Sequence, residues 1–593
     1  MLRRSLLKTL GLSGMAAMVD STRLRANTPV ADTHLQLPVA GFNQVGYLPR
    51  AQKKASVLLP SGKNAAGAEF QLLSDAGAVA FHGPLSAPGK DAASGDTVTL
   101  ADFSAVTTPG VYTIAVGGRR SAMFSIAGDV YRDPLRLAMR SYYGQRCGCA
   151  VDLGGGYKHD ACHLAAAWHA SSGRTGPIAN RGGWHDAGDY GRYVVNSSIT
   201  VATLLWAWEF YTEALRKLRL QIPESNQKTP DYLSEVRWNL EWMLSLQDRD
   251  GQDADGGVWH KQTSEQFCGF ILPERDTLTS YVIGTGAAPF KSTCATADLA
   301  AVAAIAARIY GEFDSAFAAK CLAAAKSAWS WAMAHPAVVF TNPSGVATGE
   351  YGDKHCGDEL LWASAELWRT TGEAQYERAL LDAAATLPAK SVVWIPSWAN
   401  VAPLGYWTWL MAGRKSSDAK RSEPLQAAAL EQTMSAATTL TNRAATSGYG
   451  ATLGLEDYVW GSNSVAANQS LLLLVANRLQ PNAQLVETAL GNLHYLLGRN
   501  CFGVSWVTQV GSNPLQHPHH RPSAADGIAA PWPGLLSGGP NAHPSDAASK
   551  GLPQAPPMRM WLDDQSAYSL NEVAINWNAP LVFLLAAANS LQA

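Results

Sequence analysis

Two patterns of hydrophobic positions divide the chain. In residues 37–128, short runs such as 55–59, 69–73, 97–100 and 110–116 alternate apolar and polar residues, and Gly, Pro and Asp turns separate them. Period-two alternation with this turn spacing predicts an all-β sandwich of the immunoglobulin type. The module carries no cluster of reactive groups, so we expect its role to be structural.

In residues 130–593 the apolar positions follow helical spacing instead. We count about twelve helical stretches, which include 133–146, 198–215, 230–247, 295–310, 315–334, 357–371, 373–387, 424–440, 463–478, 483–497 and 571–591. Long loops such as 517–558 separate some of them, and long loops in a compact domain are usually functional. An even number of antiparallel helices suggests an α/α toroid, although the pattern alone does not exclude a helical solenoid.

Residues 1–26 fit neither pattern. Arg3, Arg4 and Lys8 precede an apolar run that ends in small residues near Ala26. This layout predicts an export signal peptide. The paired arginines resemble a twin-arginine signal without its usual leading Ser or Thr, and an ordinary signal is an equal alternative. We therefore expect an exported protein, periplasmic or secreted, and we expect no later run to be apolar for long enough to span a bilayer.

The composition of the chain limits the classes of binding partner that we expect. A net charge of −2 gives no basis for capturing nucleic acid or an anionic membrane surface. The chain has 20 Trp residues, and although core packing accounts for most such residues, exposed rings also stack on sugar faces. The 8 Cys residues are scattered, which excludes a disulfide scaffold, and we expect Cys294, Cys321 and Cys501 simply to be buried.

The first candidate for chemistry is the glycine-rich stretch 182–193. It contains Asp186 and Asp189, framed by Trp184, Tyr190 and Tyr193, just before a predicted helix. Two carboxylates on a loop at a helix entrance can converge on a ligand. The simpler interpretation is a helix cap followed by a first-turn acid.

The second candidate is Glu572, within the aromatic-rich run 561–579. It lies three residues after Ser569, which also fits a capping box, and both interpretations can hold together. Burial would raise the pKa of Glu572 as a general acid requires, whereas Asp186 and Asp189 should stay ionised in more polar surroundings.

The third candidate is the run 505–521, which ends in His517, His519, His520 and Arg521. Three histidines in four positions could bind a metal. Pro518 keeps the segment extended, so neighbouring side chains diverge. We therefore favour a role in hydrogen bonding to hydroxyl groups of a ligand.

These three stretches together resemble the hallmarks of family 9 glycoside hydrolases, the cellulase family once called E. The run 43–49 also resembles the start of the immunoglobulin-like module that precedes many such catalytic domains. The resemblance covers nearly the whole mature chain and implies an (α/α)6 barrel acting as an inverting endo-β-1,4-glucanase on cellulose or related β-glucans. Alternatives within the family are an exo-acting cellodextrinase, β-glucosidase or exo-glucosaminidase. A non-catalytic glycan-binding protein is less well supported, because every proposed catalytic carboxylate is present. We expect a monomer.

The resemblance also implies residue roles. Asp189 would be the general base, Asp186 would help to hold the attacking water, and Glu572 would be the general acid. His519, Arg521, Asp563 and Tyr568 would line the groove near the scissile bond, and Trp184 is assigned to substrate binding. Inversion needs room for a water molecule, so the acid and base should stand roughly 6.5–9.5 Å apart.

Two metal sites complete the expectations. Cys147, Cys162, His163 and His185 form a two-plus-two set of thiolates and imidazoles that suits tetrahedral zinc, and the resemblance implies a structural zinc at these positions. Cys149 is a competing ligand, and a Cys147–Cys162 disulfide would exclude the site. For calcium, Asp358 and Glu359, after Asp353, partly match a family site of oxygen ligands, with Asn400 near where relatives have Asp. Favourable acids at a helix N-terminus are an equal alternative.

Overall fold

The computed structural model describes residues 40–58, 67–179, 182–225, 228–249 and 253–591. The expected export signal at 1–26 lies outside the described residues and stays a prediction. The first residues of the predicted β module, 37–39, also lie outside them.

Two β-sheets form the N-terminal module. One has the strand order β1 (Ala40–Gly41), β3 (Lys54–Leu58), β7 (Thr97–Asp102) and β6 (Gly89–Lys90). The other has the order β2 (Gly46–Tyr47), β10 (Phe124–Ile126), β8 (Gly110–Val116), β4 (Glu69–Ser74) and β5 (Val79–Pro84), with β9 (Arg119–Arg120) beside β8. Phe70, Phe103, Tyr112 and Phe124 belong to its separate hydrophobic core. The immunoglobulin-like module predicted from alternation is confirmed.

The rest of the described chain contains twelve helices of 9 to 28 residues. They are α1 (Arg132–Gly144), α2 (Val194–Arg216), α3 (Asp231–Ser245), α4 (Thr293–Tyr310), α5 (Ser315–Ala334), α6 (Gly357–Thr371), α7 (Ala374–Thr386), α8 (Ala402–Leu410), α9 (Ala419–Thr446), α10 (Ser462–Leu479), α11 (Ala483–Leu496) and α14 (Ile575–Ser590). Two short helices, α12 (Arg521–Ala525) and α13 (Tyr568–Asn571), lie in the long loops before α14.

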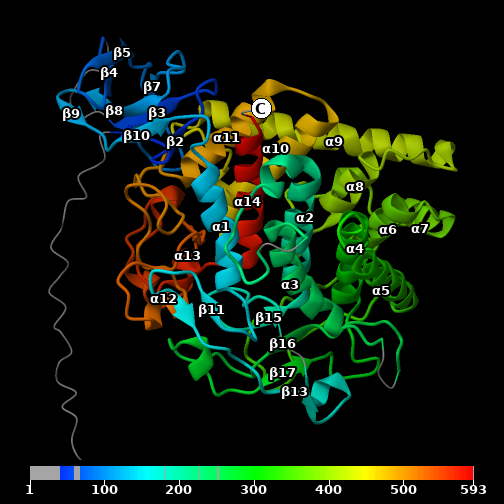
Figure 1. The fold of residues 1–593 in the computed structure, drawn as a ribbon. Helices are drawn as coiled ribbons and strands as arrows, with labels where there is room; N and C mark the ends of the chain where they lie inside the picture. Colours follow the sequence, from blue (N-terminus) through cyan, green and yellow to red (C-terminus); the bar gives the residue numbers. More distant parts are fainter. Residues whose placement is uncertain (1–39, 59–66, 180–181, 226–227, 250–252, 592–593) are drawn as a thin grey trace, which may run out of the picture.

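The helices form two sets, one whose members pack side by side and one whose members pack outside the first. Contacts run from α14 to α2, then to α4, α6 and α8, and from α10 back to α14. Outside them, α1 packs on α14, α3 on α2, α5 on α4, α7 on α6 and α11 on α10. Helices of the first set, such as α4, are buried almost all round, as expected for helices that are apolar on every face. Figure 1 shows α14 running through the middle of the helical body.

Helix α8 was not predicted from the sequence. It is short and contains Pro403 and Gly405, both poor helix formers. Gly405 allows α8 to approach α6 closely, because a Cβ atom there would lie 2.1 Å from Leu361 Cδ2 and 3.0 Å from the Trp362 Cα atom.

Helix α4 is the one helix in the described part of the chain that is long and apolar enough to cross a membrane. The sequence-based expectation that no such run exists is therefore wrong by that measure. However, 89% of the window is buried inside the protein, and α4 packs against α2, α5 and α6. Its apolar character is explained by the protein core.

A third sheet lies at one end of the helical body (Figure 1). Its order is β14 (Pro177–Ile178), β13 (Ala166–Trp168), β17 (Ser280–Ile283), β16 (Lys261–Thr263) and β15 (Arg192–Tyr193). The two strands β11 (Val151–Asp152) and β12 (Lys158–His159) pair nearby in the chain. Because β15 comes directly after the 182–191 loop, the sheet fixes one end of that loop.

Candidate active site and metal-binding clusters

The three predicted carboxylates meet in one cleft. A cavity of about 420 Å³ is lined by Asp186, Asp189 and Glu572 together with aromatic residues, among them Tyr193, Phe267, Tyr351, Trp398, Trp460 and Trp577. Segments that lie hundreds of residues apart in the sequence therefore supply one surface. A carboxylate trio walled by aromatic rings can bind a sugar chain and move protons on both sides of a bond.

Asp186 is only 1% exposed and both of its carboxylate oxygens accept hydrogen bonds. The Asn196 amide donates to Oδ1, and the Tyr351 hydroxyl donates to Oδ2 at 2.7 Å. Burial and the negative charge of Asp189 raise the pKa of Asp186 to about 7. The expectation of more polar surroundings is therefore wrong for Asp186, because its carboxylate is buried and its pKa is raised.

Asp189 lies nearer the cleft and is 8% exposed. Its Oδ2 accepts a hydrogen bond from the backbone N–H of Gly191 at 2.9 Å and one from the Tyr193 hydroxyl at 3.4 Å. The preceding residue must be glycine, because a Cβ atom on Gly188 would lie 2.0 Å from the backbone oxygen of His519. This close approach joins the Asp189 loop to the segment that carries His519.

Glu572 ends the short helix α13 and precedes α14, which starts only at Ile575. The capping-box prediction is wrong, because the Ser569 hydroxyl donates to Asp546 instead. Glu572 is partly exposed as a residue, but its carboxyl group is enclosed by protein. Burial, followed by the negative charges of Asp189 and Asp186, raises the pKa of Glu572 well above its usual value. A higher pKa favours the protonated form of this carboxyl group.

Arg521 and His519 lie against the Asp189 loop at Gly188. Arg521 is 7% exposed, and its guanidinium donates to the backbone oxygens of Cys268 and Gly188. It therefore ties the 268–276 segment to the Asp189 loop. The His519 ring contacts Phe270 and Tyr568, and its Nδ1 lies 2.8 Å from the Gln565 oxygen. Tyr568 in turn contacts the Trp460 ring.

Five residues assigned to the groove are not among those that line the cleft, namely Trp184, His519, Arg521, Asp563 and Tyr568. Trp184 is fully buried, and its indole N–H donates to Glu235, so its assignment to substrate binding is wrong. Asp563 accepts the backbone N–H groups of Gln516 and His517 and is not among the cleft-lining residues. Its carboxylate positions the 516–521 segment.

The predicted zinc ligands converge. One ligand atom from each of Cys147, Cys162, His163 and His185 lies within 4.8 Å of every other. Cys147 Sγ lies 3.6 Å from His163 Nδ1, and Cys162 Sγ lies 3.8 Å from His185 Nε2. Zinc bonds of about 2.0–2.3 Å in a tetrahedron place ligand atoms about 3.3–3.8 Å apart, so the four residues fit zinc.

The surroundings of this cluster support the same fit. Cys147 and Cys162 are free thiols, and Cys149 is not part of the cluster. His163 Nε2 lies 3.3 Å from Asp276 Oδ2, an arrangement that fixes the ring of a metal-binding histidine. His185 directly precedes Asp186, so the cluster adjoins the carboxylate loop.

The predicted calcium residues lie in a larger acidic cluster. Burial, followed by the charge of Asp358, raises the pKa of both Asp298 and Glu359. Asp298 lies one turn after Cys294 on α4, and Cys294 Sγ lies within 4.8 Å of a Glu359 carboxylate oxygen at the start of α6. Both carboxylate oxygens of Asp298 and of Glu359, and Oδ2 of Asp353, are buried without a hydrogen-bond partner among the described residues. Asp358 Oδ2 accepts the Val401 N–H at 2.8 Å. Buried carboxylates without donors fit a hard cation with oxygen ligands.

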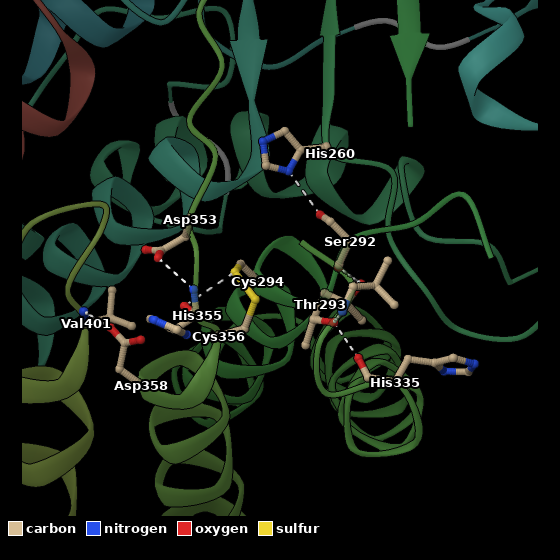
Figure 2. Close-up of a disulfide and its surroundings, with 12 residues drawn as sticks. His260, Ser292, Thr293, Cys294, His335, Asp353, His355, Cys356, Asp358 and Val401 are labelled. Atoms are coloured by element: carbon tan, nitrogen blue, oxygen red, sulfur yellow. Dashed lines mark hydrogen bonds between the residues drawn. A yellow bond between two sulfur atoms is a disulfide. The ribbon is translucent and has the colours of Figure 1, made fainter. Parts of the chain in front are cut away.

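A disulfide that the sequence did not predict lies beside this cluster. Cys294 in α4 is bonded to Cys356, which directly precedes α6 (Figure 2). The expectation that Cys294 is merely a buried thiol is wrong, whereas Cys321 and Cys501 are buried free cysteines as predicted.

Comparisons with known proteins agree with this arrangement. The sequence profile of Glycosyl hydrolase family 9 matches residues 131–585, and that of the Cellulase N-terminal ig-like domain matches residues 39–121. The chain is 37% identical to Endoglucanase D of Acetivibrio thermocellus, over 92% of this chain and 82% of that protein. It is 33% identical to a Cellodextrinase of Butyrivibrio fibrisolvens, over 92% of this chain and 98% of that protein. The crystal structure of a metagenome-derived glycoside hydrolase family 9 endoglucanase superposes with a TM-score of 0.84 at 39% identity, covering 94% of this chain and 100% of the other.

Proposed function

The chain belongs to glycosyl hydrolase family 9, and from that premise we propose that it is an inverting endo-β-1,4-glucanase acting on cellulose or related β-glucans. The observation that carries the proposal is the single cleft in which Asp186, Asp189 and Glu572 meet between aromatic walls. An exported location, in the periplasm or outside the cell, and a monomeric state are part of the proposal. They are supported only by the sequence.

We assign the proton transfers to two residues. Glu572 gives its proton to the leaving glycosidic oxygen, and Asp189 takes a proton from the water that attacks the anomeric carbon from the opposite face. Asp186 orients this water. The products are one chain with an inverted anomeric hydroxyl group, whose oxygen comes from water, and one chain whose 4-hydroxyl group keeps the glycosidic oxygen and the proton from Glu572. The proton left on Asp189 returns to Glu572 through solvent before the next turnover.

The raised pKa of Glu572 supports its role as the acid, because a higher pKa favours the protonated form that a general acid needs. Asp189 is better placed than Asp186 to accept a proton, because both oxygens of Asp186 already accept hydrogen bonds from Asn196 and Tyr351. Asp189, in contrast, accepts hydrogen bonds from the described residues only at Oδ2, which leaves Oδ1 for a proton.

The helices are proposed to form an (α/α)6 barrel in residues 130–593, preceded by the immunoglobulin-like module at 37–128. Support comes from the contacts of α2, α4, α6, α8, α10 and α14, which alternate in sequence with helices that pack outside them. In such a barrel the loops at one end carry the active site, which agrees with the origin of the cleft residues.

Zinc is proposed at Cys147, Cys162, His163 and His185, with a structural role. When bound, the metal supplies a fixed tetrahedral anchor. Fixing His185 and His163 would also fix their neighbours, because His185 adjoins Asp186 in the chain and His163 contacts Asp276. Calcium is proposed at Asp298, Asp353, Asp358 and Glu359, where it would neutralise buried negative charge.

The decisive substitution is Glu572→Gln. General acid catalysis contributes about 10²–10⁴ in rate, so hydrolysis of a cellodextrin should fall by that factor. A dinitrophenyl glycoside, whose leaving group needs no protonation, should lose much less. Glu241→Gln, on the exposed face of α3, serves as the control. Equal losses on both substrates would contradict the assignment of the acid.

An exo-acting cellodextrinase is the second candidate, favoured by the full-length similarity to the Butyrivibrio protein. Viscosity and reducing ends measured together on a long soluble β-glucan separate the two. A rapid fall in viscosity per bond cleaved indicates endo action. One small product from the first minutes, with viscosity preserved, indicates exo action.

A further inference from the structure

The Cys294–Cys356 disulfide joins the beginnings of two core helices. Cys294 lies in the first turn of α4, and Cys356 is the residue before α6, 62 positions later in the sequence. Both are nearly buried, at 2% and 3% exposure. Figure 2 shows the bond with Asp353 and Asp358 on its α6 side. The disulfide therefore fixes the separation of these two helix ends.

The acidic cluster is built from the same two helix ends. Asp298 follows Cys294 by four residues, which places both on one face of α4. Asp358 and Glu359 lie in the first turn of α6. A carboxylate oxygen of Glu359 and the two sulfur atoms lie within 4.8 Å of one another. Disulfide and carboxylates thus share one buried region.

The described protein groups supply neither hydrogen-bond donors nor cationic side chains to offset the burial of Asp298 and Glu359. Asp298 and Glu359 are 1% and 0% exposed, and all four of their oxygens lack hydrogen-bond donors within the described residues. The ion pairs found in the described ranges also include no Lys or Arg partner for Asp298, Asp353, Asp358 or Glu359. Unpaired buried carboxylates repel one another and are costly to desolvate. Without a cation, keeping these groups charged at the starts of α4 and α6 is therefore unfavourable.

We propose that the Cys294–Cys356 disulfide pre-organises the calcium site, so that calcium affinity and the stability of the disulfide are coupled. The inference rests on the calcium site proposed above. The disulfide holds Asp298 near Glu359 before the ion arrives, and a ligand set that needs no assembly binds more tightly. By linkage, calcium must protect the disulfide from reduction by the same factor.

The coupling extends to the active site through a short segment. Asp353 lies two residues after Tyr351, whose hydroxyl donates to Asp186. On the other side, Asp358 accepts the Val401 N–H, and Trp398 packs against the Tyr351 ring at 5.1 Å between centroids. With calcium bound and the disulfide intact, the site would therefore restrain Tyr351 both through Asp353 and through Trp398.

Calcium titration tests the proposal on three full-length, zinc-loaded proteins. They are the unaltered chain, the double variant Cys294→Ala/Cys356→Ala, and the control Cys321→Ala, which removes a buried free thiol on α5. Isothermal titration should find one tight site in the unaltered chain and in the control. The double variant should bind about tenfold more weakly or worse, a difference of about 1.4 kcal/mol. Equal affinity in all three proteins would overturn the coupling.

A second measurement uses the unaltered chain and does not depend on the folding of a variant. A dithiol buffer reduces the disulfide to two thiols with two electrons and two protons, and alkylation followed by mass spectrometry reports the state of Cys294 and Cys356. Saturating calcium should lower the midpoint potential by about 30 mV for each tenfold of coupling. A midpoint that does not move with calcium would also overturn the coupling.

The variant Asp298→Asn separates failure of the site from failure of the coupling. It keeps the disulfide but should lose calcium binding and the rise in melting temperature that calcium gives the unaltered chain. If the unaltered chain binds no calcium, or Asp298→Asn binds it equally well, the calcium site itself is wrong. The assignment of Glu572 and Asp189 would stand in either case.

Discussion

The hydrogen bond from Tyr351 to Asp186 makes the most direct prediction about pH dependence. The Tyr351 hydroxyl lies 2.7 Å from Asp186 Oδ2 and stabilises the ionised carboxylate, so it lowers a pKa that burial and Asp189 raise to about 7. Tyr351→Phe removes only this donor. The ring still packs against Tyr193 and Trp398.

The magnitude follows from the charge on the acceptor. A hydrogen bond to a charged group contributes about 1.5–3 kcal/mol, and about 1.4 kcal/mol corresponds to one pKa unit. The pKa of Asp186 should therefore rise by about one to two units in the variant. If Asp186 must be ionised to orient water, activity at pH 7 falls by roughly 5- to 50-fold and recovers toward higher pH.

The assay is the pH profile of kcat/KM on a cellodextrin, which reports the free enzyme. The acid limb should move upward, while the alkaline limb, set by the proton of Glu572, should stay. Tyr406→Phe removes a buried hydroxyl on α8 that bonds to Leu387 and should leave both limbs unchanged. A uniform loss at every pH, with the acid limb unmoved, would refute the electrostatic reasoning.

Three further outcomes test other parts of the molecule. Cys162→Ser should lose its zinc by elemental analysis and melt at a lower temperature, and retained metal with an unchanged melting temperature would contradict the zinc site. Phe267→Ala removes a 49% exposed ring from the cleft wall and should raise KM about fivefold, near 1 kcal/mol, with little change in kcat; an unchanged KM would exclude stacking there. Asp96→Ala removes the acceptor for Tyr449 and Arg559 between the module and the helical part. It should reduce the free energy of unfolding by about 2 kcal/mol, and an unchanged urea midpoint would show that this junction contributes nothing.

The elements that the sequence predicted well are those whose pattern is local. The alternation at 69–73 corresponds to β4 at Glu69–Ser74, and the helical spacing at 315–334 corresponds to α5 at Ser315–Ala334. Helix α2 begins at Val194, four residues before its predicted start, because Asn196, Ser197 and Ser198 are buried polar residues that hide the apolar pattern. The third sheet was missed because strands of two to four residues have too little periodicity to detect.

Some residues of the candidate site could likewise be selected from local sequence motifs, and others could not. Asp186, Asp189 and Glu572 stand in compact aromatic-rich motifs, so one sequence was enough to select them. Tyr351 and Asp298 were missed because each acts through a partner from a distant segment. Nothing in the residues around either one marks it. Pairing of Cys294 with Cys356 depends likewise on the packing of α4 against α6.

Asp186 brings these distant contributions together. A carboxylate at 1% exposure is costly to keep charged, and two side-chain donors offset that cost, Asn196 from α2 and Tyr351 from the segment before α6. Its own backbone is held by hydrogen bonds with Gly191 and Ile575 and follows directly after His185 of the thiolate and imidazole cluster. The two proposed metals would therefore act on the same carboxylate from opposite directions, zinc through the backbone and calcium through the Tyr351 donor. Loss of zinc should then disturb where Asp186 lies, whereas loss of calcium should disturb mainly its pKa.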